Sequence, residues 1–472
     1  MRRLPLLLWL VCCAAALRKA ACTPSSERMR IQSVIDKTPC GPDLSKLVEP
    51  IPWVGHRLRL ASPCIGIHGC KFALEAMGAP TDTCLGYDLV AGYRSCLVQE
   101  LIEMGVDMVN INEHLHLGPE DGDILCVDFT YLASLHIDLL VCGPPCPPWA
   151  SCGSHKHMKD PKARIFMRII IWILVLSHCS GLLCVVVENV TGVLASYDGI
   201  EPAMDKFLRL LRLFVPSFVW RVDTLDLRQY LHPQSRKRTF LRGLRSIVAK
   251  IVPSPLAPFG TTPLVNFLGN FRHTPRSTFS HQQQLNIQCY ERKICDQVAR
   301  GCLYETDIVI IAPDRQEGLG WGQSMSINCA PTWTTQNDDL MILSVGDVVH
   351  QVPDGDRRFF RKFTPTERLT LQSFPASLAL YLGESLTGFA TGNAYPPVLI
   401  LATLYPLIKA ISSSDLDLAS WPETTAAVPW QAIRRMQRYL VARGRIVDKK
   451  KHDAAKTKAT RRKRARASSD SK

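Results

Sequence analysis

The 472-residue sequence contains 18 cysteines, but it has no Cys-x-x-Cys pair. Common zinc-binding modules use such closely spaced pairs, so their absence argues against zinc ribbons and zinc fingers. Cys142, Cys146, Cys152, His155 and His157 follow none of the usual ligand spacings, and we expect no metal at them. The spacing of the cysteines along this long chain is irregular, which favours reduced thiols over a disulfide framework.

The body of the chain also lacks a strong charge of either sign. The net charge is +14, but residues 448–472 carry eleven Lys or Arg against three Asp, and four more cations lie within the first 19 residues. Residues 20–447 therefore carry a net charge of only +2. A surface of the body that binds a polyanion must then be local.

No apolar run in the body is long and uninterrupted. Residues 169–187 are nearly continuous in apolar side chains, but Ser177–Gly181 breaks them in the middle. The pattern predicts a helix over 164–176, a turn, and a buried strand over 182–187, which is typical of the interior of an α/β sheet. The alternative is a membrane span.

The two ends of the chain suggest conflicting cellular locations. Residues 1–24 resemble a secretory signal or a transit peptide, with two arginines followed by an apolar stretch. Residues 460–466 resemble a nuclear-localisation or polyanion-binding run, and a solvated tail is the alternative for them. We predict a nuclear protein without a membrane anchor in its mature form; an organellar leader or a misassigned start codon is the alternative.

Cys146 is the most informative residue. It lies within Gly143–Trp149, where prolines flank it on both sides, directly after the apolar run 137–141. That run predicts a buried parallel strand, and the prolines hold the thiol in one pose at the carboxyl end of the strand. Ligands bind at this edge of open α/β sheets. Cys146 is therefore a candidate nucleophile, and a buried structural cysteine is the alternative.

Upstream, residues 58–62 predict a strand, followed by a turn that contains Gly66 and Gly69 and by a helix over 71–77. This order opens a nucleotide-binding βαβ unit, although an ordinary tight turn explains two glycines equally well. Asp88 follows about 20 residues later, after a second predicted strand, where an acidic residue commonly binds ribose hydroxyls. Asp123 is another acidic residue near a predicted strand end.

Further segments recur downstream in a specific order. They are Val185–Val190, Pro233–Arg238, Leu371–Pro375 and Gly392–Pro397. Together with the Cys146 loop, the series resembles the PPC, ENV, QxRxR, LQGFP and GNAxPP motifs of the cytosine C5-methyltransferase family. The resemblance covers roughly residues 58–410 and looks closest to divergent protist and algal members, whose cysteine motif also reads GPPCPP.

The resemblance implies a catalytic set in which every member is present. Cys146 would add to C6 of cytosine, and Glu188 would protonate or hydrogen-bond N3 so that the ring becomes electrophilic. Arg238 would contact O2 of the base, and Arg236 and Gln234 would position it. The activated C5 would then take a methyl group from S-adenosyl-L-methionine.

The resemblance also implies a set of residues that bind S-adenosyl-L-methionine, with Phe72 as a further packing partner. These are Pro63, Ile65, Gly66, Gly69, Asp88, Asp123, Ile124, Pro144 and Asn393. The family's dense glycine cluster is absent, with Pro63, Cys64 and His68 in its place. In the LQGFP motif, Ser373 replaces glycine and Thr370 replaces the arginine that usually precedes it.

The implied fold is α/β, a Rossmann-like methyltransferase sheet with a small irregular target-recognition lobe inserted before the last catalytic motifs. We expect the segments to divide as follows: a leader at 1–24, the catalytic domain at 56–245, the recognition lobe at 246–360, the return to the catalytic domain at 361–411, and a helix with a basic tail at 412–472. The final helix is predicted over 429–440.

The resemblance implies DNA as the substrate. It also implies a flipped cytosine, because chemistry on C6 requires the base to leave the stack. A branch of the family methylates transfer RNA with the same residues, so tRNA is the alternative. An inactive, nucleic-acid-binding homologue is the second alternative, and we expect a monomer. The basic runs 236–245 and 357–362 are predicted to contact phosphates, with a solvated hinge as the alternative for the second run.

Overall fold

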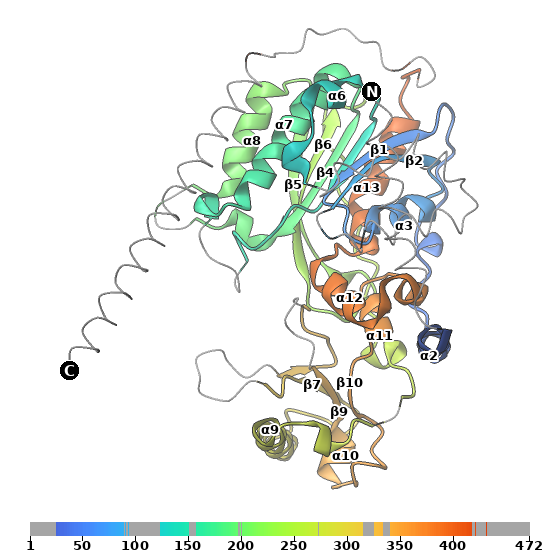
Figure 1. The fold of residues 1–472 in the computed structure, drawn as a ribbon, viewed down its shortest axis with the longest axis vertical. Coiled ribbons are helices and arrows are strands. Elements are labelled where there is room, and N and C mark those ends of the chain that lie inside the picture. Colours follow the sequence, from blue (N-terminus) through green and yellow to red (C-terminus); the bar gives the residue numbers. More distant parts are fainter. Residues whose placement is uncertain are drawn as a thin grey trace, which may run out of the picture.

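The computed structural model describes residues 25–88, 90, 93, 123–150, 157–196, 199, 201–271, 273–314, 325–333, 340–417, 421 and 431. Within these residues the chain forms a six-stranded sheet covered by helices and, at the other end of the molecule, a separate four-stranded sheet (Figure 1). The predicted leader and basic tail, and the predicted final helix apart from Gln431, lie outside the described residues.

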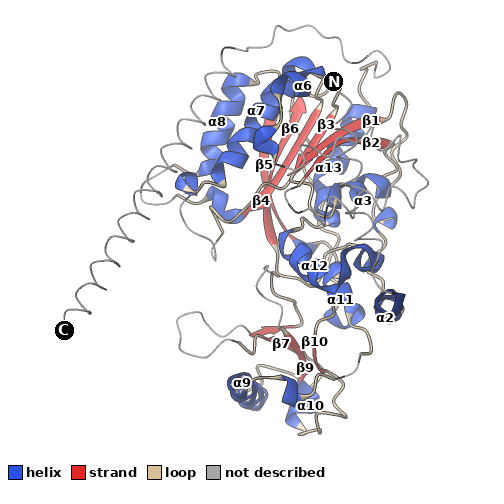
Figure 2. Ribbon diagram, viewed as in Figure 1, coloured by secondary structure: helices blue, strands red, loops and turns tan. Residues whose placement is uncertain are grey.

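Strands make up the core of both parts (Figure 2). They are β1 Leu58–Pro63, β2 Thr81–Tyr87, β3 Leu139–Cys142, β4 Cys184–Val190, β5 Phe218–Asp226, β6 Lys237–Arg245, β7 Ile308–Ile311, β8 Met325–Ile327, β9 Met341–Ser344 and β10 Phe360–Lys362. The α-helices are α2 Ser25–Ile35, α3 Gly69–Ala76, α6 Phe129–Ser134, α7 Ala163–Cys179, α8 Ala203–Phe214, α9 His281–Ala299, α10 Val345–Val349, α11 Pro365–Thr370, α12 Ala379–Asn393 and α13 Pro397–Ser412.

The larger sheet has the strand order β2-β1-β3-β4-β6-β5. Strands β1 to β4 are parallel, whereas β6 runs antiparallel to both β4 and β5. The carboxyl ends of β1, β3 and β4 therefore meet at one edge of the sheet, where ligands bind in open α/β folds. The predicted α/β class is confirmed.

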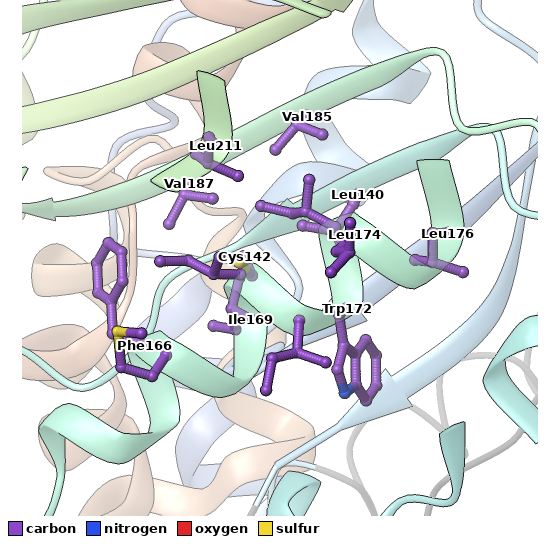
Figure 3. Close-up of a cluster of buried hydrophobic side chains, with 14 of the residues drawn as sticks. Leu140, Cys142, Phe166, Ile169, Trp172, Leu174, Leu176, Val185, Val187 and Leu211 are labelled. Atoms are coloured by element: carbon purple, nitrogen blue, oxygen red, sulfur yellow. The ribbon is translucent and has the colours of Figure 1, made fainter. Parts of the chain in front are cut away.

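Helices cover both faces of this sheet, with α6, α7 and α8 on one face and α3 and α13 on the other (Figure 1). Successive strand residues point to opposite faces, so Leu140 packs beneath α7 while Leu139 packs on the side of α13. Figure 3 shows the core around α7, where Trp172 and Leu174 lie against strand residues. A helix that is apolar all round is expected in such a buried layer.

The predicted break in the apolar run 169–187 is present, since α7 ends at Cys179 and β4 begins at Cys184. Among the described helices, none alone is long and apolar enough to cross a membrane. By length and composition only, one bent pair, Leu386–Asn393 with Pro397–Ser412, passes that test when taken together.

The smaller sheet is antiparallel, in the order β10-β9-β7-β8. A buried ion pair joins it to the segment that returns to the larger sheet. Arg361 on β10 donates to both carboxylate oxygens of Glu367 on α11, at 2.7 and 2.9 Å. Glu367 also accepts the backbone N–H of Gly269 at 2.8 Å, so the carboxylate is well satisfied.

The prediction that both basic runs contact phosphates is wrong for most of their arginines. Residues 237–245 form β6, which lies between β4 and β5, so side chains along it enter packed faces. Arg242 is fully buried and pairs with Asp223 at 2.8 Å. In the second run, Arg357 and Arg361 are likewise buried, which also rules out a solvated hinge there.

Candidate active site

The Cys146 loop leaves the carboxyl end of β3 and is held by its own tight turn. The backbone N–H groups of Trp149 and Ala150 donate to the carbonyl of Cys146, at 2.9 and 3.0 Å. The Trp149 ring is buried against Phe166 and Phe207. A stiff loop with a buried aromatic anchor therefore presents the thiol, as the flanking prolines predicted.

Contacts across the sheet edge also fix this loop. Asn189, at the end of β4, donates from Nδ2 to the carbonyl of Pro144 at 3.1 Å. Gly143 must be glycine, because a Cβ there would lie 2.7 Å from the ring of Tyr395 and 3.1 Å from Oε2 of Glu188. Pro144, predicted to touch the cofactor, is thus seen to anchor the loop through its carbonyl.

Glu188 and Arg238 form a buried ion pair beside this loop. Nε of Arg238 lies 2.8 Å from Oε1 of Glu188, and both side chains are about nine-tenths buried. They come from neighbouring antiparallel strands, β4 and β6, which brings together residues 50 positions apart in the sequence. Burial raises the pKa of the Glu188 carboxyl, while Arg238 and Arg236 oppose that shift. A glutamate with a raised pKa is suited to hold and deliver a proton.

Cys146 lies close enough to Glu188, Arg236 and Arg238 for their charges to shift the pKa of its thiol. Burial raises the pKa of its thiol, Arg238 and Arg236 lower it, and Glu188 adds to the rise. Four of the five predicted catalytic side chains, Cys146, Glu188, Arg236 and Arg238, are therefore close enough to influence one another's charge. Two nearby cations favour the thiolate, which is the nucleophilic form.

Gln234 and Arg236 carry polar atoms that the surrounding protein does not satisfy. Gln234 is 0 % exposed, and neither atom of its side-chain amide has a hydrogen-bond partner among the described residues. Arg236 donates from Nη2 to the carbonyl of Ala394, but its buried Nε and Nη1 find no acceptor there. Burial lowers the pKa of Arg236 to about 9. Each unmet buried group costs about 1–3 kcal/mol, so these donors indicate a polar ligand.

The small sheet reaches this motif through a short backbone bridge that no sequence pattern predicted. The N–H of Ser235 donates to the carbonyl of Ala330 at 2.7 Å, and the N–H of Ala330 donates to the carbonyl of Pro233 at 2.7 Å. The hydroxyl of Thr332 also donates to the carbonyl of Ser235. The segment after β8 thus holds the backbone on both sides of Gln234.

We expect Thr332→Val to lower kcat about fivefold without changing the affinity for S-adenosylmethionine, because a lost hydrogen bond of roughly 1 kcal/mol would loosen the Gln234 loop. Thr332→Ser keeps the hydroxyl and is the matched control. Single-turnover methylation and cofactor titration would measure the two effects. A valine variant with full activity would show that the bridge does not position the loop.

At the cofactor end, carboxylates gather around the turn after β1. Asp88 accepts the backbone N–H of Gly66 at 3.0 Å through one oxygen and that of Val90 at 2.8 Å through the other. Asp123 caps a short 3-10 helix by accepting the N–H of Leu125 at 2.9 Å. Burial and then the charges of Asp88 and Asp123 raise the pKa of the Cys64 thiol, so both predicted carboxylates lie near this turn.

The turn keeps a left-handed geometry although it has lost the family's glycines. Cys64, Gly66 and His68 have φ of 58°, 55° and 57°. Only Gly66 adopts this conformation without cost, and the other two are strained by about 1–2 kcal/mol each. No atom lies within 4 Å of a Cβ built on Gly66, so this glycine faces open space. The altered sequence therefore preserves room for a ligand at Gly66.

Both glycines of this turn have close partners within the described part of the protein. The N–H of Gly66 donates to Asp88. Gly69 is small for another reason: its Cβ would lie 2.5 Å from the carbonyl oxygen of Tyr395. The close neighbour at Gly69 is the segment that leads into α13, and no ligand is needed to explain the glycine.

The remaining residues that were predicted to bind the cofactor differ in their exposure to solvent. Ile65, Ile124 and Pro63 are buried, and Ile124 belongs to the core beneath α7, which leaves these side chains little surface for a ligand. Asn393 is exposed at the end of α12, beside Tyr93. Phe72, predicted to pack on the cofactor, instead packs edge-on against Phe374, with ring centroids 5.9 Å apart.

Arg168 is a residue of this region that the sequence analysis missed. It points from α7 to the segment after Asp123, where its guanidinium donates to the carbonyls of Ile124 and Val127 and lies 3.7 Å from the ring of Phe129. Burial lowers its pKa to about 10. An arginine within the apolar part of a helix was the available signal, because such a charge must find partners when buried.

Ser373 shows how the altered LQGFP motif is accommodated. Its φ is 64°, the conformation that glycine adopts most easily. Its hydroxyl accepts the N–H of Val398 at 2.9 Å and donates to the carbonyl of Gln372 at 2.5 Å. The serine thus satisfies one of the unpaired N–H groups at the start of α13, which offsets the cost of its backbone conformation.

We expect Ser373→Gly to change the free energy of unfolding little, because the loss of the cap is matched by relief of the backbone strain. Ser373→Ala should destabilise the protein by about 1–2 kcal/mol more than the glycine variant, since alanine loses the cap and keeps the strain. Urea unfolding of the two variants measures the difference. Equal stability of the two variants would contradict this account of the serine.

Comparison with known proteins identifies a family whose profile matches the chain. The family profile described as "C-5 cytosine-specific DNA methylase" matches residues 64–409. No sequence among curated proteins matches the chain.

Several solved methyltransferase structures align with the chain at low identity. The Entamoeba histolytica methyltransferase EhMeth is 12% identical with a TM-score of 0.47, and the alignment covers 75% of this chain and 99% of the other. Dnmt2 methyltransferase from S. pombe is 16% identical with a TM-score of 0.46, covering 75% and 99%. A putative DNA modification methyltransferase encoded within an E. coli prophage is 13% identical with a TM-score of 0.49, covering 75% and 100%.

Proposed function

The chain belongs to the C-5 cytosine-specific DNA methylase family, and we propose that it methylates C5 of cytosine in DNA through a covalent bond between Cys146 and C6. One observation carries the proposal: the buried Glu188–Arg238 pair lies in the electrostatic neighbourhood of Cys146. This group offers a nucleophile, a proton donor and hydrogen-bond donors.

In the proposed mechanism, the Cys146 thiolate adds to C6 while Glu188 delivers a proton to N3, and the electron pair of the C5–C6 double bond makes C5 nucleophilic. Arg238 stabilises the charge on O2. S-adenosylmethionine supplies the electrophilic methyl group when it is bound. A base then removes the C5 proton, the electrons of that C–H bond restore the double bond, the sulfur leaves C6 as a thiolate, and N3 returns its proton to Glu188.

Several residues fit the cofactor. Gly66 faces open space at the carboxyl edge of the sheet, and Asp88 and Asp123 gather beside it. We propose that one of these carboxylates binds the ribose hydroxyls and that Asn393 borders the site. Carboxylates at this edge of the sheet are well placed to bind ribose hydroxyls, which supports this assignment.

We propose DNA as the substrate because the matching profile describes a DNA methylase, and we retain tRNA as the alternative. The cytosine has to leave the stack to reach a buried thiol, and unpaired donors at Gln234 and Arg236 suit the edge of an extruded base. The region of the small sheet, predicted over 246–360, would act as the recognition lobe, since its segment after β8 supports the Gln234 loop.

Covalent trapping tests the proposal. The full-length protein is incubated with S-adenosylmethionine and with 5-fluorocytosine placed either in duplex DNA or in tRNA. Fluorine cannot leave as a proton does, so a working enzyme stalls as an adduct that denaturing electrophoresis detects. We expect an adduct with DNA. An adduct with tRNA alone would move the substrate to RNA, and cofactor binding without any adduct would support an inactive homologue.

The pH dependence should reflect the two raised pKa values. A raised pKa keeps Cys146 protonated near neutrality, so the thiolate fraction grows as pH rises. Glu188, whose pKa is also raised, keeps its proton to a higher pH than an ordinary glutamate. We expect kcat/KM to pass through a maximum as pH rises, because the thiolate fraction of Cys146 grows while the protonated fraction of Glu188 falls. A rate without such a maximum would contradict the assignment.

A further inference from the structure

The free edge of the larger sheet forms a groove that the methylation chemistry does not use. Strand β5 pairs with β6 on one side and with no other strand among the described residues. The residues Phe218–Arg221 of β5 form its floor, the end of α8 at Arg212 forms one wall, and Lys250–Val252 form the other. Its volume is about 460 Å³. In Figure 1, α8 lies beside β5 at this flank of the molecule.

The groove is positively charged. Arg212 and Lys250 are exposed, and neither forms an ion pair with any residue in the described part of the chain. Arg221 adds a third cation, although it is partly committed to Asp223 at 2.8 Å. Among the described residues, no carboxylate lines the groove. Because the body of the chain is nearly neutral, three cations around one groove are a local concentration of charge.

An exposed aliphatic side chain also lies in this groove. Ile251, one of the lining residues, is 77 % exposed. Leu213 and Ile247, which are 68 % and 61 % exposed, are close in the sequence to the lining residues Arg212 and Lys250. Exposed apolar groups that gather around a groove indicate a binding surface more strongly than the same groups scattered singly. The groove therefore combines cations with an exposed aliphatic side chain.

We propose that this groove binds an extended acidic segment of a partner protein, which adds to β5 as a further strand. A peptide supplies the alternating N–H and C=O groups that a free strand edge lacks, and its side chains alternate between the two walls. Glutamate or aspartate would pair with Arg212 and Lys250, and aliphatic residues would cover the exposed side chain of Ile251.

Charge argues against two occupants that the chain itself could offer, a second copy and the basic tail. Two copies that paired through β5 would bring their groove cations together, and like charges in close contact oppose association. The tail of residues 448–472 carries eleven Lys or Arg against three Asp, so it is repelled as well. A nucleic acid could neutralise the cations but has no backbone amides with which to extend a sheet. An acidic peptide satisfies both requirements.

The groove lies far from the proposed catalytic site. Arg238, which pairs with Glu188, stands near the start of β6, whereas Arg245, opposite Phe218, stands at its other end. Seven residues of strand separate them by about 23 Å. A bound partner would therefore leave Cys146 accessible, so the groove and the methylation chemistry can be tested separately.

Fluorescence anisotropy with the full-length protein tests the proposal. The probe is a labelled octapeptide made of two Glu-Glu-Val-Val units, which presents one acidic and one aliphatic residue in turn to each wall. One control peptide carries lysine in place of glutamate, and another carries N-methyl groups on alternate amides, which block strand pairing while keeping charge and side chains. We expect the unmodified acidic peptide to bind at least ~10-fold more tightly than either control.

Charge reversal then locates the binding surface. Arg212→Glu and Lys250→Glu should each weaken binding of the acidic peptide by about tenfold, whereas Lys46→Glu, a reversal at an exposed residue elsewhere, should not. Methylation activity should be unchanged in all three variants. Equal binding of the N-methylated or lysine peptide, no effect of the groove variants, or displacement of the peptide by single-stranded DNA would each overturn the proposal.

Discussion

Cys146→Ser should abolish turnover and covalent trapping, while the dissociation constant for S-adenosylmethionine stays within about twofold of the wild-type value. A serine hydroxyl has a far higher pKa than a thiol, and burial in this site already raises the pKa of the ionisable group at position 146. We expect kcat to fall by about 10⁴-fold or more, as is typical when a nucleophile is removed.

The cofactor affinity should survive because the loop does not depend on the thiol for its shape. The backbone turn at Cys146, the buried ring of Trp149 and the bond from Asn189 to Pro144 all remain in the serine variant. Cys295→Ser, at an exposed cysteine of α9, is the matched control and should be fully active. Retention of turnover in Cys146→Ser would refute the covalent mechanism.

Glu188→Gln should lower kcat by about 100- to 1000-fold, which corresponds to a loss of roughly 3–4 kcal/mol of transition-state stabilisation. The amide of glutamine can still accept the hydrogen bond from Nε of Arg238, but it cannot give a proton to N3 of the base. The raised pKa of Glu188 is the property that the substitution removes. Single-turnover kinetics on duplex DNA measures the effect.

A change in folding has to be separated from this chemical effect. Replacement of Glu188 leaves the positive charge of Arg238 about nine-tenths buried without its counter-ion, and breaking a buried pair in this way can cost about 3–5 kcal/mol. Chemical denaturation and cofactor titration of the same variant therefore accompany the kinetics. If Glu188→Gln is folded, binds S-adenosylmethionine and turns over at the wild-type rate, Glu188 is not the proton donor.

The local pattern of the chain was sufficient for much of the site. The apolar run before Gly143 and the prolines around Cys146 predicted a thiol at the end of a buried strand, and β3 ends there. Glu188 was predicted at the end of the next buried strand, and it lies on β4. Such predictions succeed because side-chain periodicity and the geometry of proline act over a few residues.

The same local reasoning failed where a residue's partner is distant in the sequence. Arg242 looked like part of a basic surface, but β6 lies between two strands, and the arginine is buried against Asp223. Gly69 looked like a ligand-facing glycine, but its neighbour is Tyr395, more than 300 residues later. Neither strand order nor the return of α13 to the larger sheet is encoded in a short window of sequence.

Taken alone, the sequence determined which chemical groups the protein has and in what order they follow its strands: Cys146, Glu188, and the Gln234–Arg238 motif. Only the tertiary structure decided which of them meet. It paired Glu188 with Arg238 across antiparallel strands, supported Gln234 through Ala330, and left β5 as a cationic edge. The physical reason is that the burial of a side chain, its ion pairs and its pKa depend on its neighbours in space. The order of the strands and the packing of the helices on the sheet set those neighbours.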